Sequence, residues 1–138
     1  LSSMLPECDF VVLAMALTPE TRGLIGEREL RAMKPSACLI NVARGQVVDE
    51  AVLVRALEEG WIAGAGLDVV VDQAPPLDHR LLQLDNVIVT PHTAFFSQEA
   101  VLELEERAAG EVARVFQGQM PDNLVNPAVL PHARMKVA

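Results

Sequence analysis

The sequence has few basic residues and no long apolar run, and both absences exclude classes of function. Its 11 Lys and Arg stand against 19 Asp and Glu, so the formal net charge is −8. Nucleic-acid binding requires clustered cations that displace counterions from phosphates, and we therefore exclude a nucleic-acid partner. No apolar stretch is long enough to span a bilayer, and the first residues lack the pattern of a signal peptide. We expect a cytoplasmic protein without membrane contact.

Cysteine is also scarce. Cys8 and Cys38 each lie in or beside an apolar run, without the spacing of metal ligands. This pattern predicts two free, buried thiols in a reducing compartment and no metal site. The 138 residues fit one domain or part of a larger one. Because the chain begins at Leu1, inside what resembles a helix end, we expect an earlier part to precede it.

Short apolar runs alternate with helical patterns along the first two thirds of the chain. The first strand is apolar almost throughout, as expected of a strand covered on both faces of a sheet. Strands that alternate with helices imply a parallel sheet with right-handed crossovers, and hence an α/β fold. The expected strands are 9–15, 37–42, 62–70 and 87–90, and the expected helices between them are 27–33 and 50–59. We expect the glycines of the third strand to let helices pack closely.

The last third of the sequence has a different pattern. Ser97 is a candidate N-cap for a long amphipathic helix that ends at Gly118. The apolar face of this helix needs a partner surface. From Gln119 onward three prolines predict a mostly irregular tail, of the kind that packs on something outside the sheet.

A residue able to do chemistry follows or ends each expected strand: Thr18, Arg44, Asp68 and His92. The carboxyl ends of parallel strands share one edge, where ligands bind in open α/β sheets. Arg44 could bind a carboxylate through two parallel hydrogen bonds, although a surface arginine that caps the turn is the alternative. His92 could exchange a proton near neutral pH, although a structural histidine is the alternative. We interpret His79 and His132 as surface residues.

Six segments together resemble the D-isomer-specific 2-hydroxyacid dehydrogenases. They are 17–26, 33–35, 39–45, 63–69, 85–92 and 123–127. The resemblance covers only the later half of such a protein. The glycine-rich dinucleotide fingerprint would precede Leu1, and the Gly64-Ala65-Gly66 sequence is no substitute because it lacks a third glycine and enters a strand.

The resemblance implies an NAD(P)-dependent oxidoreductase that acts on a D-2-hydroxy acid or 2-keto acid. Residues 1–96 would form the C-terminal half of a Rossmann-type NAD-binding domain, and 97–138 a helix and tail that pack on a substrate domain. The cofactor would be NAD or NADP. By resemblance we also expect a homodimer for the complete protein and no activity for this piece alone.

The resemblance also implies roles for single residues. Arg44 would bind the substrate's carboxylate and carbonyl, and His92 would exchange the proton that accompanies hydride transfer. This agrees with the chemistry, since reduction of a 2-keto acid needs a cation for the carboxylate and a proton donor for the developing alkoxide. The residues expected to contact the cofactor are Thr18, Val42, Ala43, Arg44, Asp68, His92, Thr93, Ala94 and Phe95.

Gln73 departs from the family pattern. Relatives usually place a glutamate five residues after the aspartate that corresponds to Asp68, paired with the catalytic histidine. A carboxylate would favour the imidazolium form of His92, whereas the Gln73 amide can orient the ring but adds no charge. Asp72 could take over this role only if the loop shifts.

Two alternatives remain open. Formate dehydrogenases of the same superfamily carry a glutamine with the histidine, so Gln73 permits oxidation of formate or a similar small anion. The sequence of 93–97, however, resembles the hydroxyacid enzymes. The other alternative is a catalytically weakened, dinucleotide-sensing module, which Gln73 does not support because the family's corepressors tend to keep the glutamate.

Overall fold

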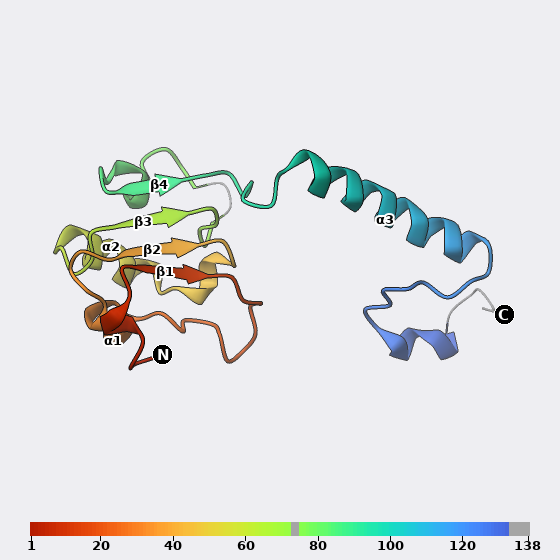
Figure 1. The fold of residues 1–138 in the computed structure, drawn as a ribbon, viewed down its shortest axis with the longest axis horizontal. Coiled ribbons are helices and arrows are strands. Elements are labelled where there is room, and N and C mark those ends of the chain that lie inside the picture. Colours follow the sequence, from red (N-terminus) through yellow and green to blue (C-terminus); the bar gives the residue numbers. More distant parts are fainter. Residues whose placement is uncertain (73–74, 133–138) are drawn as a thin grey trace. The chain divides into compact units, whose positions relative to one another are not determined.

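The computed structural model describes residues 1–72 and 75–132 of the chain. The chain divides into two compact units, Leu1–Ala94 and Phe95–Ala138. The first unit holds the sheet and its helices, and the second holds a long helix and the tail (Figure 1). The assignment of these units to a cofactor-binding and a connecting role stays a prediction.

Four parallel strands form the sheet of the first unit: β1 (Phe10–Leu13), β2 (Cys38–Asn41), β3 (Gly64–Leu67) and β4 (Val87–Val89). They lie side by side in sequence order. Helix α1 (Glu27–Ala32) connects β1 to β2, and helix α2 (Glu50–Glu58) connects β2 to β3. A short 3-10 helix, η3 (Arg80–Gln83), precedes β4. The predicted α/β fold with a parallel sheet is confirmed.

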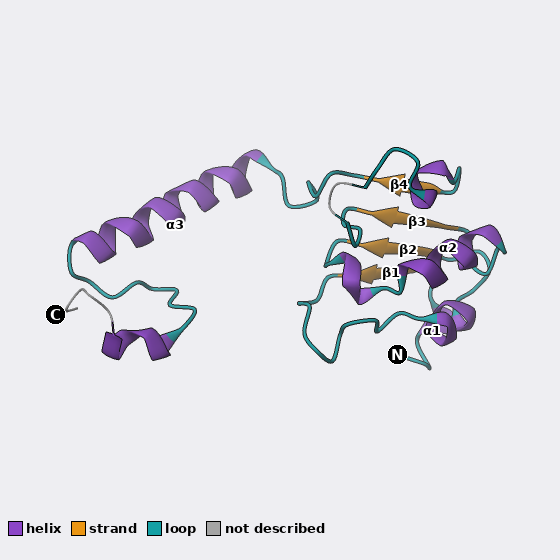
Figure 2. Cartoon of the chain, turned by 180° about the vertical axis from the view of Figure 1, so that it is seen from behind, coloured by secondary structure: helices purple, strands orange, loops and turns teal. Residues whose placement is uncertain are grey.

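Helices α1 and α2 cover the same face of the sheet, as Figure 2 shows from behind. The core between them is apolar, and both layers contribute leucines to it: Leu30, Leu39, Leu53, Leu57 and Leu67. On the other face Phe10, Val12 and Ile88 are 67%, 56% and 72% exposed. Among the described residues the first strand is covered on one face, and not on both as expected, because α1 and α2 lie on the same side of the sheet.

The ends of α2 follow the sequence pattern. Asp49 is the N-cap, and its Oδ1 accepts a hydrogen bond from the Val52 N–H at 3.2 Å. Gly60, just past the helix, has a φ of +69°, which glycine adopts without the steric cost of a Cβ. Gly64, one of the two glycines of β3, has a different role from the one predicted. A Cβ on Gly64 would lie 2.7 Å from the carbonyl oxygen of Asn86, so the close approach is to the chain before β4 and not to a helix.

The second unit consists of α3 (Gln98–Phe116) and the tail after it. The hydroxyl of Ser97 accepts from the Ala100 N–H at 3.1 Å, which confirms the predicted N-cap. The Glu111 carboxylate accepts from the main-chain N–H groups of Asp122 and Asn123, and so ties the tail to the helix. A short 3-10 helix, η4 (Pro127–His132), interrupts the tail that we expected to be mostly irregular.

Two smaller expectations were tested as well. Cys8 and Cys38 are free, as predicted, but only half-buried. Among the described residues, no helix has the length and apolar character to cross a membrane.

Candidate functional site

The candidate site lies at the carboxyl edge of the sheet. The last residues of the four strands form one row across it: Leu13, Asn41, Leu67 and Val89. The main-chain N–H of each residue that follows β2, β3 and β4 donates a hydrogen bond to the carbonyl oxygen of the last residue of the preceding strand. These hydrogen bonds are 2.9 to 3.1 Å long. These hydrogen bonds keep the three chain segments in register just beyond the sheet. Side chains that follow them therefore start from a common edge.

The turn that carries Arg44 is closed by Asn41, whose side chain is buried. The Asn41 Oδ1 accepts from the Ala43 N–H, and its Nδ2 donates to the Arg44 carbonyl, both at 3.0 Å. Arg44 itself is exposed, and its Nη1 donates to the Ala43 carbonyl at 2.6 Å. One buried amide thus fixes the main chain from which the guanidinium projects.

Gly45 packs this turn against the segment that follows β3. A Cβ at Gly45 would lie 2.2 Å from the carbonyl carbon of Val70, which no side chain can tolerate without a backbone shift. On the other side of the turn, the carbonyl oxygens of Gln46 and Val47 accept hydrogen bonds from main-chain N–H groups in the segment before α1. The Arg44 turn is therefore held from two sides.

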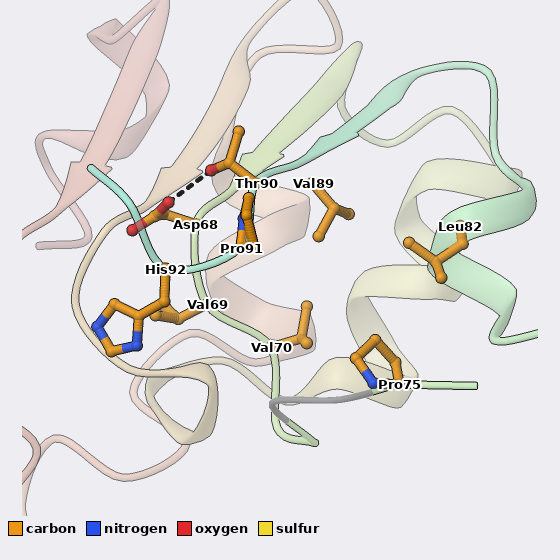
Figure 3. Close-up of a pocket in the computed structure, with 9 residues that line it drawn as sticks. All are labelled: Asp68, Val69, Val70, Pro75, Leu82, Val89, Thr90, Pro91 and His92. Carbon is orange, nitrogen blue, oxygen red and sulfur yellow. Dashed lines mark hydrogen bonds between the residues drawn. The ribbon is translucent and has the colours of Figure 1, made fainter. Parts of the chain in front are cut away.

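Asp68 organises the turn that carries His92. Its Oδ1 accepts from the Thr90 hydroxyl at 2.5 Å (Figure 3). The same Oδ1 accepts from the Thr93 N–H at 2.8 Å, and Oδ2 accepts from the Ala94 N–H at 2.9 Å. Burial raises the pKa of this carboxyl, but the hydrogen bonds and the nearby His92 outweigh burial and hold the pKa below its usual range. Asp68 is therefore a buried anion near neutral pH.

His92 has a φ of +56°, in the left-handed region, where a non-glycine residue costs about 1–3 kcal/mol. Its N–H lies 3.0 Å from both the Asp68 and the Thr90 carbonyl oxygens, so the surrounding main chain imposes this conformation. Figure 3 shows the imidazole directed away from Leu82 and Pro75. The ring therefore projects from a turn whose main chain is held by Asp68.

A cavity of about 350 Å³ lies beside this turn. Its lining is mainly apolar, and Figure 3 draws the described residues that line it: Asp68, Val69, Val70, Pro75, Leu82, Val89, Thr90, Pro91 and His92. The cavity thus borders both Asp68 and the histidine turn.

Arg44 follows β2 and His92 follows β4, on the same edge and with β3 between them. Neighbouring strands lie about 4.8 Å apart, so the two strand ends are separated by roughly 10 Å. That separation leaves room for a small acid between two long side chains.

The other predicted site residues lie in several places. Val42 and Ala43 belong to the Arg44 turn. Thr18 lies beyond the end of β1, in a turn where its N–H donates to the Thr21 hydroxyl at 2.7 Å. Phe95 belongs to the second unit, where its ring contacts Phe96 edge-on. Gln73, the predicted partner of His92, lies outside the described residues, and Asp72 is exposed.

The interpretation of His79 is wrong. We interpreted it as a surface residue, but its side chain is only 20% exposed and its Nε2 lies 3.2 Å from the Glu50 carboxylate. Neither Glu50 nor the buried Asn41 was singled out from the sequence. A polar residue that ends an apolar strand was the available signal for Asn41, whereas no local signal pairs Glu50 with His79. His132 is exposed, as predicted.

Comparison with known proteins assigns the family. Residues 1–94 match the family described as "D-isomer specific 2-hydroxyacid dehydrogenase, NAD binding domain". The chain belongs to the D-isomer-specific 2-hydroxyacid dehydrogenases. The family that the sequence segments resemble is thus confirmed, as is the Rossmann-type NAD-binding fold.

Three similar proteins illustrate the range of this dehydrogenase family. A glyoxylate reductase from Korarchaeum cryptofilum is 47% identical over 94% of this chain and 39% of its own length. The structure of a D-lactate dehydrogenase with NAD⁺ from Lactobacillus jensenii has a TM-score of 0.81 and 33% identity, over 91% of this chain and 42% of that one. An acyclic imino acid reductase in complex with NADPH and D-Arg has a TM-score of 0.80 and 30% identity, over 91% and 39%. The chain therefore spans about two fifths of the length of the relatives it matches.

Proposed function

We propose that this protein reduces a 2-keto acid to a D-2-hydroxy acid with NADH or NADPH. The observation that carries the proposal is the placement of the Arg44 and His92 turns beyond two strand ends of one sheet edge, each fixed by a buried polar side chain. The names of the matched relatives, a glyoxylate reductase and a D-lactate dehydrogenase, support this substrate class.

The chain's own residues fit the nicotinamide end of such a cofactor. The carboxylate oxygens of Asp68 offer about four acceptor sites in all, and the described hydrogen bonds use three of them. Oδ2, which among the described residues accepts only from the Ala94 N–H, can accept one more donor, such as a carboxamide. The described residues include no glycine-rich phosphate loop, so we assign them no contact with the pyrophosphate.

The two side chains divide the chemistry between them. The Arg44 guanidinium binds the substrate carboxylate through two parallel hydrogen bonds and orients the neighbouring carbonyl. The cofactor, when bound, supplies a hydride to the carbonyl carbon. The His92 imidazolium donates its proton to the carbonyl oxygen as that oxygen becomes the hydroxyl, so charge does not accumulate there. Asp68 keeps the His92 turn in place and stays ionised while it does so.

The test is turnover by the whole protein. We expect NADH or NADPH oxidation with glyoxylate, pyruvate or hydroxypyruvate. Replacement His92→Gln should lower kcat by roughly 10²–10⁴-fold while NADH binding is retained, since general acid catalysis is worth about that much. The exposed His132→Gln is the matched control and should leave kcat unchanged. Absence of turnover for all 2-keto acids at every pH would exclude the proposal.

A second candidate function rests on Gln73. A glutamine beside the catalytic histidine suits the oxidation of formate or a similar small anion, because no hydroxyl proton has to move in that reaction. NADH formation from formate without reduction of any keto acid would favour this function. Binding of NADH without any turnover, together with a protein partner, would instead favour a dinucleotide-sensing module.

A further inference from the structure

Glu50, the first residue of α2, contacts two points of the segment that leaves β3. Its Oε2 accepts a hydrogen bond from the Val71 N–H at 3.0 Å. Its Oε1 lies 3.2 Å from the His79 Nε2. A single carboxylate therefore joins the start of α2 to Val71, directly after Val70 in the lining of the cavity next to His92, and to His79.

The chemistry of His79 defines the direction of its hydrogen bond. Its Nδ1 is buried and has no hydrogen-bond partner among the described residues. The tautomer with the proton on Nε2 donates to Glu50 and leaves no unpaired N–H in the interior. An unpaired buried donor would cost about 1–3 kcal/mol, so this tautomer is the favoured one. Glu50 and His79 are 23% and 20% exposed, which protects the contact from competition by water.

Between Asp68 and Val71 the main-chain N–H groups change their hydrogen-bond acceptors. The Asp68 N–H still donates to the last residue of β2, whereas the Val71 N–H donates to the side chain of Glu50. Between them, the Val70 backbone packs on Gly45, next to Arg44. The Glu50 contacts therefore add to the Gly45 packing and fasten the Arg44 turn to the segment that begins at Asp68.

We propose that Glu50 is a positioning residue, which with His79 fixes the Arg44 turn relative to the His92 turn that Asp68 holds. This inference rests on the proposed function for its effect on catalysis. Loss of the carboxylate lets the two turns move apart, so the substrate carboxylate and carbonyl no longer meet Arg44 and His92 together. Misplacement by about 1 Å can cost on the order of 10²-fold in rate.

The kinetic test uses the whole protein and variants at both ends of one helix. We expect Glu50→Ala to lower kcat/KM for the 2-keto acid by roughly 10–100-fold, because it misaligns substrate, and to leave NADH affinity unchanged. His79→Gln keeps a donor near the Nε2 position and should retain wild-type kcat/KM. Glu58→Ala is the matched control, because Glu58 ties the far end of α2 to Arg80 in η3 and should not affect kcat/KM.

Hydrogen exchange gives a readout that does not depend on turnover. In Glu50→Ala the Val71 amide should exchange faster, and so should the amides of 45–48, whereas Glu58→Ala should change neither. If the wild type reduces no 2-keto acid, the proposed function fails while the exchange result still tests the coupling. Unchanged exchange at 45–48, or wild-type kcat/KM in Glu50→Ala, would overturn the positioning role. Should Glu50→Ala not fold, His79→Ala breaks one of the two contacts and is held to the same criteria.

Discussion

At the scale of single residues, the proposed function depends on the two parallel N–H donors of the Arg44 guanidinium. Arg44→Lys keeps the charge but replaces two parallel donors by a flexible ammonium. We expect KM for the 2-keto acid to rise by about 10–100-fold, equivalent to about 1.4–2.7 kcal/mol of substrate binding. Steady-state kinetics measure this directly. Arg107→Lys, an exposed arginine on α3, is the control and should behave as wild type.

Asp68 makes a prediction about acid stability. The pKa of Asp68 in the folded protein is held below the usual 3.8, so its ionised form stabilises the fold above that pH. This stabilisation is lost as the pH falls through the pKa of the folded protein. We expect Asp68→Asn to reduce the free energy of unfolding by about 1–3 kcal/mol at neutral pH, since buried donors lose a charged acceptor. The difference from wild type should shrink below about pH 4.

Chemical denaturation of the two proteins across this pH range checks the prediction. The exposed Asp85→Asn is the matched substitution and should leave the free energy of unfolding unchanged. A difference between Asp68→Asn and wild type that stays constant from neutral to acid pH would show that ionisation of Asp68 does not support the fold.

Gln73→Glu tests the departure from the family pattern at position 73. If position 73 contacts His92, a carboxylate there favours the imidazolium, and the histidine stays protonated to higher pH. Reduction of the 2-keto acid, which consumes that proton, should then become faster and persist to higher pH. The pH profile of kcat measures this, and an identical profile in both proteins would mean that residue 73 does not act on His92.

The sequence carried different amounts of information about different site residues. Arg44 and His92 could be identified because each follows an apolar run at a strand end, and parallel strands share that edge. Asn41, Glu50 and His79 could not be assigned their contacts. The Glu50 partners are a main-chain N–H and an imidazole far along the chain, and no local pattern encodes such a pairing.

At the scale of elements, the turn after β2 is the part most sensitive to volume. We expect Gly45→Ala to lower the free energy of unfolding by about 1–3 kcal/mol or more, because its Cβ would overlap the Val70 backbone. The same change should impair kcat/KM through displacement of Arg44. Gly110→Ala is the control, since nothing lies near its Cβ in α3 and alanine stabilises a helix by up to about 1 kcal/mol relative to glycine. Equal stability of both variants would contradict the close contact.

Element types and order could be read from the sequence, but strand lengths could not. The third strand was predicted over 62–70, whereas β3 covers only Gly64–Leu67. The apolar residues continue past its end because Val69 and Val70 are buried beyond the sheet, where the Val70 backbone packs on Gly45. Apolar periodicity reports burial, and it does not distinguish a strand from a buried segment that follows one.

At the scale of the whole molecule, the sheet of the first unit has one apolar face that its own helices do not cover. Parallel sheets are generally buried on both faces, which is why the sequence alone predicted two-sided cover for the first strand. The cytoplasmic location and the homodimer remain predictions from composition and resemblance. Sedimentation of the whole protein would measure the second of these.

The most direct test of the central claim is a crystal structure of the whole protein with NADH and oxamate, an unreactive isostere of a 2-keto acid. The account predicts one oxamate molecule whose carboxylate lies within hydrogen-bond distance of the Arg44 guanidinium and whose amide oxygen lies within the same reach of the His92 imidazole. An oxamate bound to only one of these side chains, or to neither, would contradict it.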